Sequence, residues 1–139
     1  MLKKSLYAPE NLKAYMDAIR RTEEPEVFDN AFFQKLGFQG KIDNSFVEVL
    51  KELGFLSDDA RPTMLYFRYL DEVLSKKVLA EAIRNAYSDL FILDEKANEL
   101  NFGSIKNRMK MICEGRLNNN TITSNTATFA ALCELADFS

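Results

Sequence analysis

The sequence contains no histidine and no tryptophan, and it has only two cysteines and three prolines among 139 residues. Without histidine, the chain lacks the side chain that most often acts as a general base or metal ligand near neutral pH. Cys113 and Cys133 form no CxxC pair and lie in apolar helical patterns, so we expect two reduced thiols. No GxxxxGK[ST], GxGxxG or GxSxG motif occurs. We therefore expect no enzyme: no catalytic residue, no cofactor and no bound metal.

Long hydrophobic runs are absent as well, and no stretch is apolar enough to span a membrane. The first residues, MLKKSLYAPENLK, contain lysines but lack the apolar segment of a secretion signal. We therefore expect a cytoplasmic protein without a membrane segment. The length suits a single helical domain at 1–139. We divide it into a helix-turn-helix-like part at 1–72 and C-terminal helices at 73–139 that share the same core.

Apolar residues recur at helical spacing along most of the chain, which predicts a mainly α protein. Two short segments, FDNAFFQKLGF and SFVEVLKELGF, each end in glycine followed by phenylalanine. Gly37 and Gly54 are therefore predicted to adopt a left-handed conformation, with the following phenylalanine folded back on its own helix. Asp43 or Asn44 is expected to cap the second helix.

This helix pair is followed by the polar turn SDDARP, which is the layout of a helix-turn-helix with a shortened wing. Pro62 denies the second strand of the wing a hydrogen-bond donor, so we expect a vestigial wing in a winged-helix-like unit. Further C-terminal helices should pack on this unit. We expect one long helix from about Lys76 to Phe91, one that begins at Ser104, a mobile loop at RLNNNTITS and a last helix from Ser124.

The segment TMLYFRYL is apolar almost all round, so it is either buried or part of an interface. Its aromatic side chains, Tyr66, Phe67 and Tyr69, are candidate interface residues. Val47, on the predicted outward side of the second short helix, is a fourth. The leading hypothesis is a non-enzymatic cytosolic adaptor or regulatory module that binds protein partners, including further copies of itself in a homo-oligomer.

The alternative is a DNA-binding regulator of the transcriptional or phage/defence type. The second short helix would then be a recognition helix, in which Asn44 and Lys51 could contact bases. However, residues 23–72 carry eleven acidic and five basic side chains, which opposes binding to phosphates. The best basic patch lies elsewhere, at Lys106, Lys110 and Arg116. We therefore expect weak nucleic-acid binding at most.

The order of LGFQGKIDNSFVEVLKELGFL, PTMLYFRYL, VLAEAIRNAYSDLF and TATFAALCELADF resembles a family of small prokaryotic proteins classed as a domain of unknown function. The resemblance covers nearly the whole chain. It implies no activity and transfers no functional residue. Proteins with this pattern usually have a glycine in the turn before Pro-Thr, where this chain has Ala60 and Arg61. Their last helix tends to carry a basic residue where this chain has Ala130.

Overall fold

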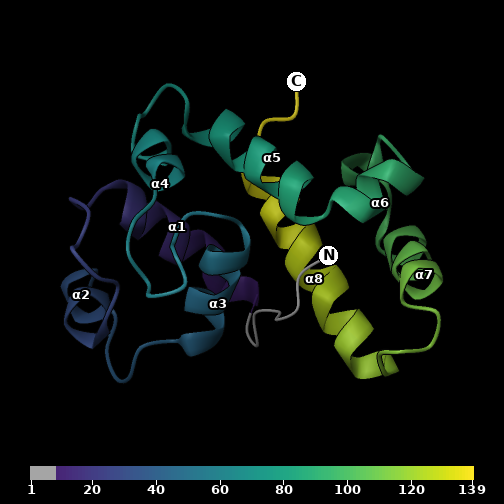
Figure 1. Cartoon of the computed structure of the whole chain (residues 1–139), viewed down its shortest axis with the longest axis horizontal. Coiled ribbons are helices and arrows are strands. Elements are labelled where there is room, and N and C mark those ends of the chain that lie inside the picture. The colour runs from purple at the N-terminus through teal and green to yellow at the C-terminus, as the bar shows by residue number, and fades with distance from the viewer. Residues whose placement is uncertain (1–8) are drawn as a thin grey trace.

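The computed structural model describes residues 9–139, and all α-helices in this range are shown in Figure 1. Over these residues no strand forms beyond one isolated bridge, so the prediction of a mainly α protein is confirmed. The helices are α1 (Leu12–Arg20), α2 (Asn30–Lys35), α3 (Asn44–Glu52), α4 (Met64–Tyr69), α5 (Ser75–Ala86), α6 (Ser88–Leu93), α7 (Phe102–Cys113) and α8 (Asn119–Leu135), with short 3-10 helices η1 (Pro9–Asn11) and η2 (Ala97–Glu99).

Helix α8 lies at the centre of the arrangement. Figure 1 shows α1 to α4 gathered on one side and α6 and α7 on the other, with α5 and α8 between them. Accordingly, α8 contacts α1, α5, α7 and η1. Its Phe129 and Leu132 are fully buried, and the Phe129 ring meets Tyr87 edge-on at a centroid distance of 4.7 Å. A single hydrophobic cluster therefore runs from α1 to α8.

The two predicted glycine endings are confirmed. Gly37 has a φ of +103° and Gly54 a φ of +88°, both in the left-handed region. After α3, the Phe55 N–H donates to the Leu50 carbonyl at 2.9 Å, and the Gly54 N–H donates to the Lys51 carbonyl at 3.0 Å. These two bonds define a Schellman motif, which satisfies carbonyls that the end of the helix would otherwise leave unpaired.

Aromatic side chains hold the first three helices together. The Phe38 ring lies 5.2 Å from Phe33, as predicted for a residue that folds back on its own helix. Tyr15 of α1 packs against both α2 and α3, with ring centroids 5.6 Å from Phe33 and 4.7 Å from Phe46. The hydroxyl of Tyr15 also donates to Asp43 at 3.1 Å, and Asp43 caps α3. One aromatic residue thus fixes the positions of both short helices.

The segment after α3 forms a tight hairpin-like turn. Its only bridge among the described residues joins Leu56 and Pro62 in antiparallel fashion. The chain before α2 lies beside this turn, since the Phe28 N–H donates to the Ala60 carbonyl at 2.8 Å. Ala60 has a φ of +62°, a conformation that a residue with a Cβ adopts at an energetic disadvantage.

The predicted long helix from Lys76 to Phe91 is interrupted. Helix α5 ends at Ala86, Tyr87 has φ −111° and ψ 33°, and α6 begins at Ser88. The sequence has neither glycine nor proline here, so local propensity does not cause the break. Tyr87 and Leu90 are both fully buried, and the change of direction between α5 and α6 accompanies this packing.

Two other helix starts differ from prediction. Helix α8 begins at Asn119, inside the tract predicted to be a mobile loop, because the Asn118 side chain accepts the Thr121 N–H at 2.8 Å. Burial of Ile122 stabilises this first part of the helix. Helix α7 begins at Phe102 rather than Ser104, since Asn101 accepts the Ser104 N–H at 2.9 Å. In both cases asparagine is the cap.

Candidate functional site

Three of the four predicted interface residues are buried inside the chain. Tyr66, Tyr69 and Val47 all belong to the core of the chain, so in this fold they present almost no surface to a partner. The Tyr69 ring packs 5.3 Å from Phe55 on the segment after α3, and burial raises the pKa of the Tyr69 hydroxyl to about 12. Only Phe67 remains at the surface, with 49% of its area exposed.

The structure shows three further exposed apolar side chains close to Phe67 in the sequence. Met64 lies one helical turn before it on α4, and Val73 and Leu74 lie in the turn that leads to α5. All three are exposed. We call Met64, Phe67, Val73 and Leu74 the α4 apolar surface. An ion pair of 3.1 Å between Arg68 and Glu81 joins α4 to α5 nearby. The other exposed large apolar residues of the described chain are Ile92, Leu93, Phe102 and Met111.

Helix α3, the predicted recognition helix, offers little surface to a partner. Asn44, at its start, is its only residue in the exposed class. Lys51 is partly buried and pairs with Glu48 at 3.3 Å, so its charge is already balanced. Val47 is buried instead of facing outward. The prediction of an outward face therefore holds at Asn44 and fails at Val47.

The predicted basic patch is divided by the structure. Lys106 and Lys110 lie one turn apart on α7, and neither forms an ion pair with another described residue. Arg116 instead turns back onto the end of α7. Its Nε donates to the Cys113 carbonyl at 2.9 Å and its Nη2 to the Ile112 carbonyl at 3.0 Å. The Arg116 guanidinium therefore caps the end of the helix, although the residue stays exposed, whereas the two lysines make no such contact.

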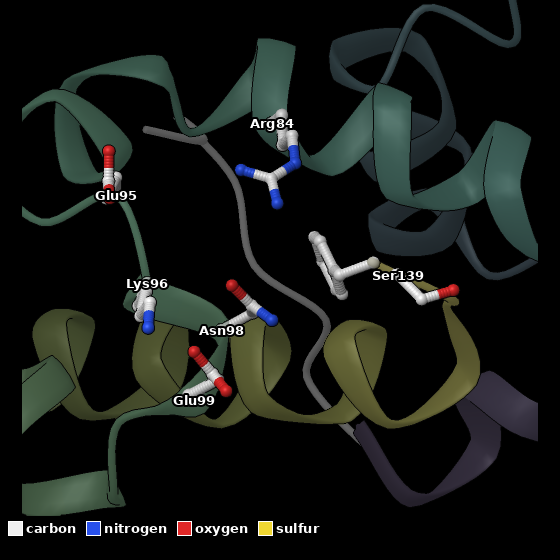
Figure 2. Close-up of a pocket in the computed structure, with 7 residues that line it drawn as sticks. Arg84, Glu95, Lys96, Asn98, Glu99 and Ser139 are labelled. Carbon is white, nitrogen blue, oxygen red and sulfur yellow. The ribbon is translucent and has the colours of Figure 1, made fainter.

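A cleft that the sequence did not indicate lies between α5, the segment around η2 and the residues that follow α8 (Figure 2). Its volume is about 580 Å³. Its lining residues are Arg84, Glu95, Lys96, Asn98, Glu99, Phe138 and Ser139. The lining thus combines two cationic, two anionic, two uncharged polar and one aromatic side chain.

Arg84 is held at this cleft by aromatic rings. Its Cζ lies 5.0 Å from the centroid of Phe91 and 5.2 Å from that of Phe138, and the two rings are 6.1 Å apart. Cation–π attraction of this kind orders a guanidinium without using its N–H groups. Those groups form no hydrogen bond or ion pair with the rest of the described chain. Figure 2 shows the guanidinium turned toward Asn98.

Sequence reasoning missed the cleft for a specific reason. Helical spacing places Arg84 on the polar face of its helix, where a charged residue ordinarily contacts only water. Phe138, which packs against it, follows more than fifty residues later in the chain. The available signal was the motif LCELADF, whose last phenylalanine lies beyond the end of α8.

The thiols are not activated for chemistry. Cys113 is buried and Cys133 half-buried, and both are free. Burial raises the pKa of both thiols, that of Cys133 to about 12. Nucleophilic cysteines require the opposite shift. Residues 9–139 also contain no group of three or more Cys, Asp or Glu side chains placed to hold a metal ion. None of the helices described is both long and apolar enough to cross a membrane.

Comparison with known proteins gives one match. The model of a family described as "Family of unknown function (DUF5343)" matches residues 6–139, which is nearly the whole chain. This confirms the resemblance to a domain of unknown function that the sequence motifs suggested. No curated protein and no solved structure matches the chain.

Proposed function

The chain belongs to the DUF5343 family, and for this member we propose a non-enzymatic adaptor or regulatory module of the cytosol that binds protein through the α4 apolar surface. The observation that carries the proposal is the gathering of four exposed apolar side chains within residues 64–74. Single apolar residues are common on protein surfaces, whereas a concentration of them marks an interaction site.

The proposed scaffold is a winged-helix-like unit made of α1, α2, α3 and the turn after α3. Two contacts support it. The Leu56–Pro62 bridge lies where the two wing strands would pair. The bond from the Phe28 N–H to the Ala60 carbonyl lies where a strand before the second helix would join them. Helix α4 follows this turn directly, so the scaffold presents the α4 apolar surface at its edge.

The partner tested first is a second copy of the chain. A two-fold contact would place the α4 apolar surface of one copy against that of the other and bury both at once. The Arg68–Glu81 pair beside this surface would then lie at the rim of the contact, where ion pairs contribute little energy but help orientation.

Sedimentation velocity over a range of protein concentrations tests this proposal. We expect concentration-dependent dimerisation that Val73→Lys abolishes. Ile92→Lys is the matched control, since Val73 and Ile92 are 86% and 85% exposed but only Val73 belongs to the α4 apolar surface. A wild-type protein that stays monomeric at every concentration would remove self-association. Equal loss of dimer in both variants would place the contact elsewhere.

The DNA-binding alternative is tested separately by fluorescence anisotropy with duplex DNA at two salt concentrations. Since α3 exposes little and Lys51 is paired with Glu48, we expect no binding tighter than ~100 μM at physiological salt. Salt-sensitive binding that Lys51→Glu abolishes and Lys106→Glu leaves intact would contradict the adaptor proposal and restore the recognition helix.

A further inference from the structure

We propose that the Arg84 cleft binds a small zwitterion, a molecule with one carboxylate and one ammonium group, such as a free amino acid. The inference goes beyond the proposed function, because the cleft shares no residue with the α4 apolar surface. One site would hold a small molecule and the other a protein.

The carboxylate would bind at Arg84. Arginine presents a planar fork of N–H donors that matches a carboxylate through two parallel hydrogen bonds. In most surface arginines this fork is mobile or already paired with an acidic side chain. Here the Phe91 and Phe138 rings order the guanidinium, while its N–H groups stay unpaired among the described residues. Among the described residues no acidic side chain occupies this fork, so it is available to the carboxylate of a ligand.

The ammonium group would be received by Glu99, which lies beyond Asn98 as seen from Arg84 in Figure 2, with Glu95 as a second carboxylate of the lining. Neither carboxylate forms an ion pair with another described residue. In Figure 2, Asn98 lies between Arg84 and Glu99, where its amide can both donate and accept a hydrogen bond. The two glutamates balance Arg84 and Lys96, so the side chains of the lining sum to no net charge. A lining of this kind favours a zwitterion over a doubly charged phosphate.

The space and the wall of the cleft fit a ligand of this class. The volume of about 580 Å³ lies within the range of small-molecule sites, roughly 300 to 1,000 Å³. Half-buried Phe138 provides an apolar surface for the carbon chain between the two charged groups. Ligands that differ only in the distance between ammonium and carboxylate therefore test the fit.

The experiment is an NMR titration of the full chain that follows the Arg84 Nε–H signal. The probes are glycine, β-alanine, 4-aminobutanoate and 6-aminohexanoate, which differ only in the distance between ammonium and carboxylate. Hexanoate and hexylamine each lack one of the two charges, and inorganic phosphate tests a dianion. We expect saturable binding of at least one zwitterion, with Kd on the order of 1 mM, and at least fivefold weaker binding of the single-charge analogues.

Variants separate the two halves of the site. Arg84→Gln, followed through neighbouring backbone amides, should weaken binding of every carboxylate at least tenfold. The double variant Glu95→Gln/Glu99→Gln should weaken binding of the zwitterion but not of hexanoate. Arg61→Gln, at an exposed arginine outside the cleft, is the control and should change nothing. The inference is overturned if no zwitterion gives a saturable shift, if Arg84→Gln binds like the wild type, or if phosphate binds more tightly.

Discussion

Replacement of Gly54 by alanine tests how α3 is ended. Gly54 has a φ of +88°, and an added Cβ would lie 3.6 Å from Leu65 Cδ2, an ordinary van der Waals distance. Alanine at this position therefore strains the backbone but causes no steric overlap with neighbouring atoms. A left-handed conformation costs a residue with a Cβ about 1 to 2 kcal/mol. The alanine also makes the unfolded chain less flexible, which returns about 0.4 to 1 kcal/mol. We expect a net loss of about 1 kcal/mol in the free energy of unfolding.

Thermal unfolding followed by circular dichroism measures this loss. For 139 residues, an unfolding entropy of about 2.1 cal/mol/K per residue sums to about 0.29 kcal/mol/K. A loss of 1 kcal/mol should thus lower Tm by about 3 °C. The control is Gly103→Ala in the first turn of α7, where φ is not positive. There alanine should leave Tm unchanged or raise it, because glycine is a poor helix former.

Gly37→Ala tests whether backbone strain or the contact with Leu65 destabilises the Gly54→Ala variant. Gly37 has a φ of +103°, and its Cβ would meet nothing within 4 Å. If strain is the cause, Gly37→Ala and Gly54→Ala should lower Tm to a similar extent. An unchanged or higher Tm in both would refute the left-handed endings. A drop confined to Gly54→Ala would assign the effect to the Leu65 contact and refute the reasoning from strain.

Four other outcomes are expected. Phe129→Ala should lower the free energy of unfolding by about 3 to 5 kcal/mol in urea titrations, because the ring is fully buried. Tyr87→Phe should preserve or raise Tm, since the buried hydroxyl has no hydrogen-bond partner among the described residues. Asn118→Ala should remove about 1 kcal/mol with the cap of α8, seen as faster hydrogen exchange in its first turn. Cys113 and Cys133 should react with a thiol reagent far more slowly than in urea, because burial raises the pKa of both.

The helix endings could be predicted from sequence because their causes are local. Gly37 and Gly54 each follow an apolar helical stripe, and only glycine reaches positive φ without strain. Asp43 or Asn44 was predicted as a cap for an equally local reason, and it is the Asp43 side chain that accepts the Ser45 and Phe46 N–H groups.

The remaining features depend on residues distant in sequence. The spacing of apolar side chains predicts that Tyr66 and Tyr69 are shielded from water. It does not show whether the same chain or a second chain shields them. Here the chain itself covers both. The break at Tyr87 likewise accompanies packing against Phe129, which lies on α8. For the same reason Arg84 has the sequence pattern of a solvated residue until Phe138 is placed beside it.

The central position of α8 has a consequence for the order of folding during synthesis. Helix α8 contacts η1 and α1 at the other end of the chain, and it begins about a hundred residues after α1 ends. At a translation rate of about 5 to 20 residues per second, α1 emerges roughly 5 to 20 s before its packing partner. During that interval the side of α1 that α8 will cover is open to chaperones and to other nascent chains. Complete burial of α1 thus waits for the synthesis of α8.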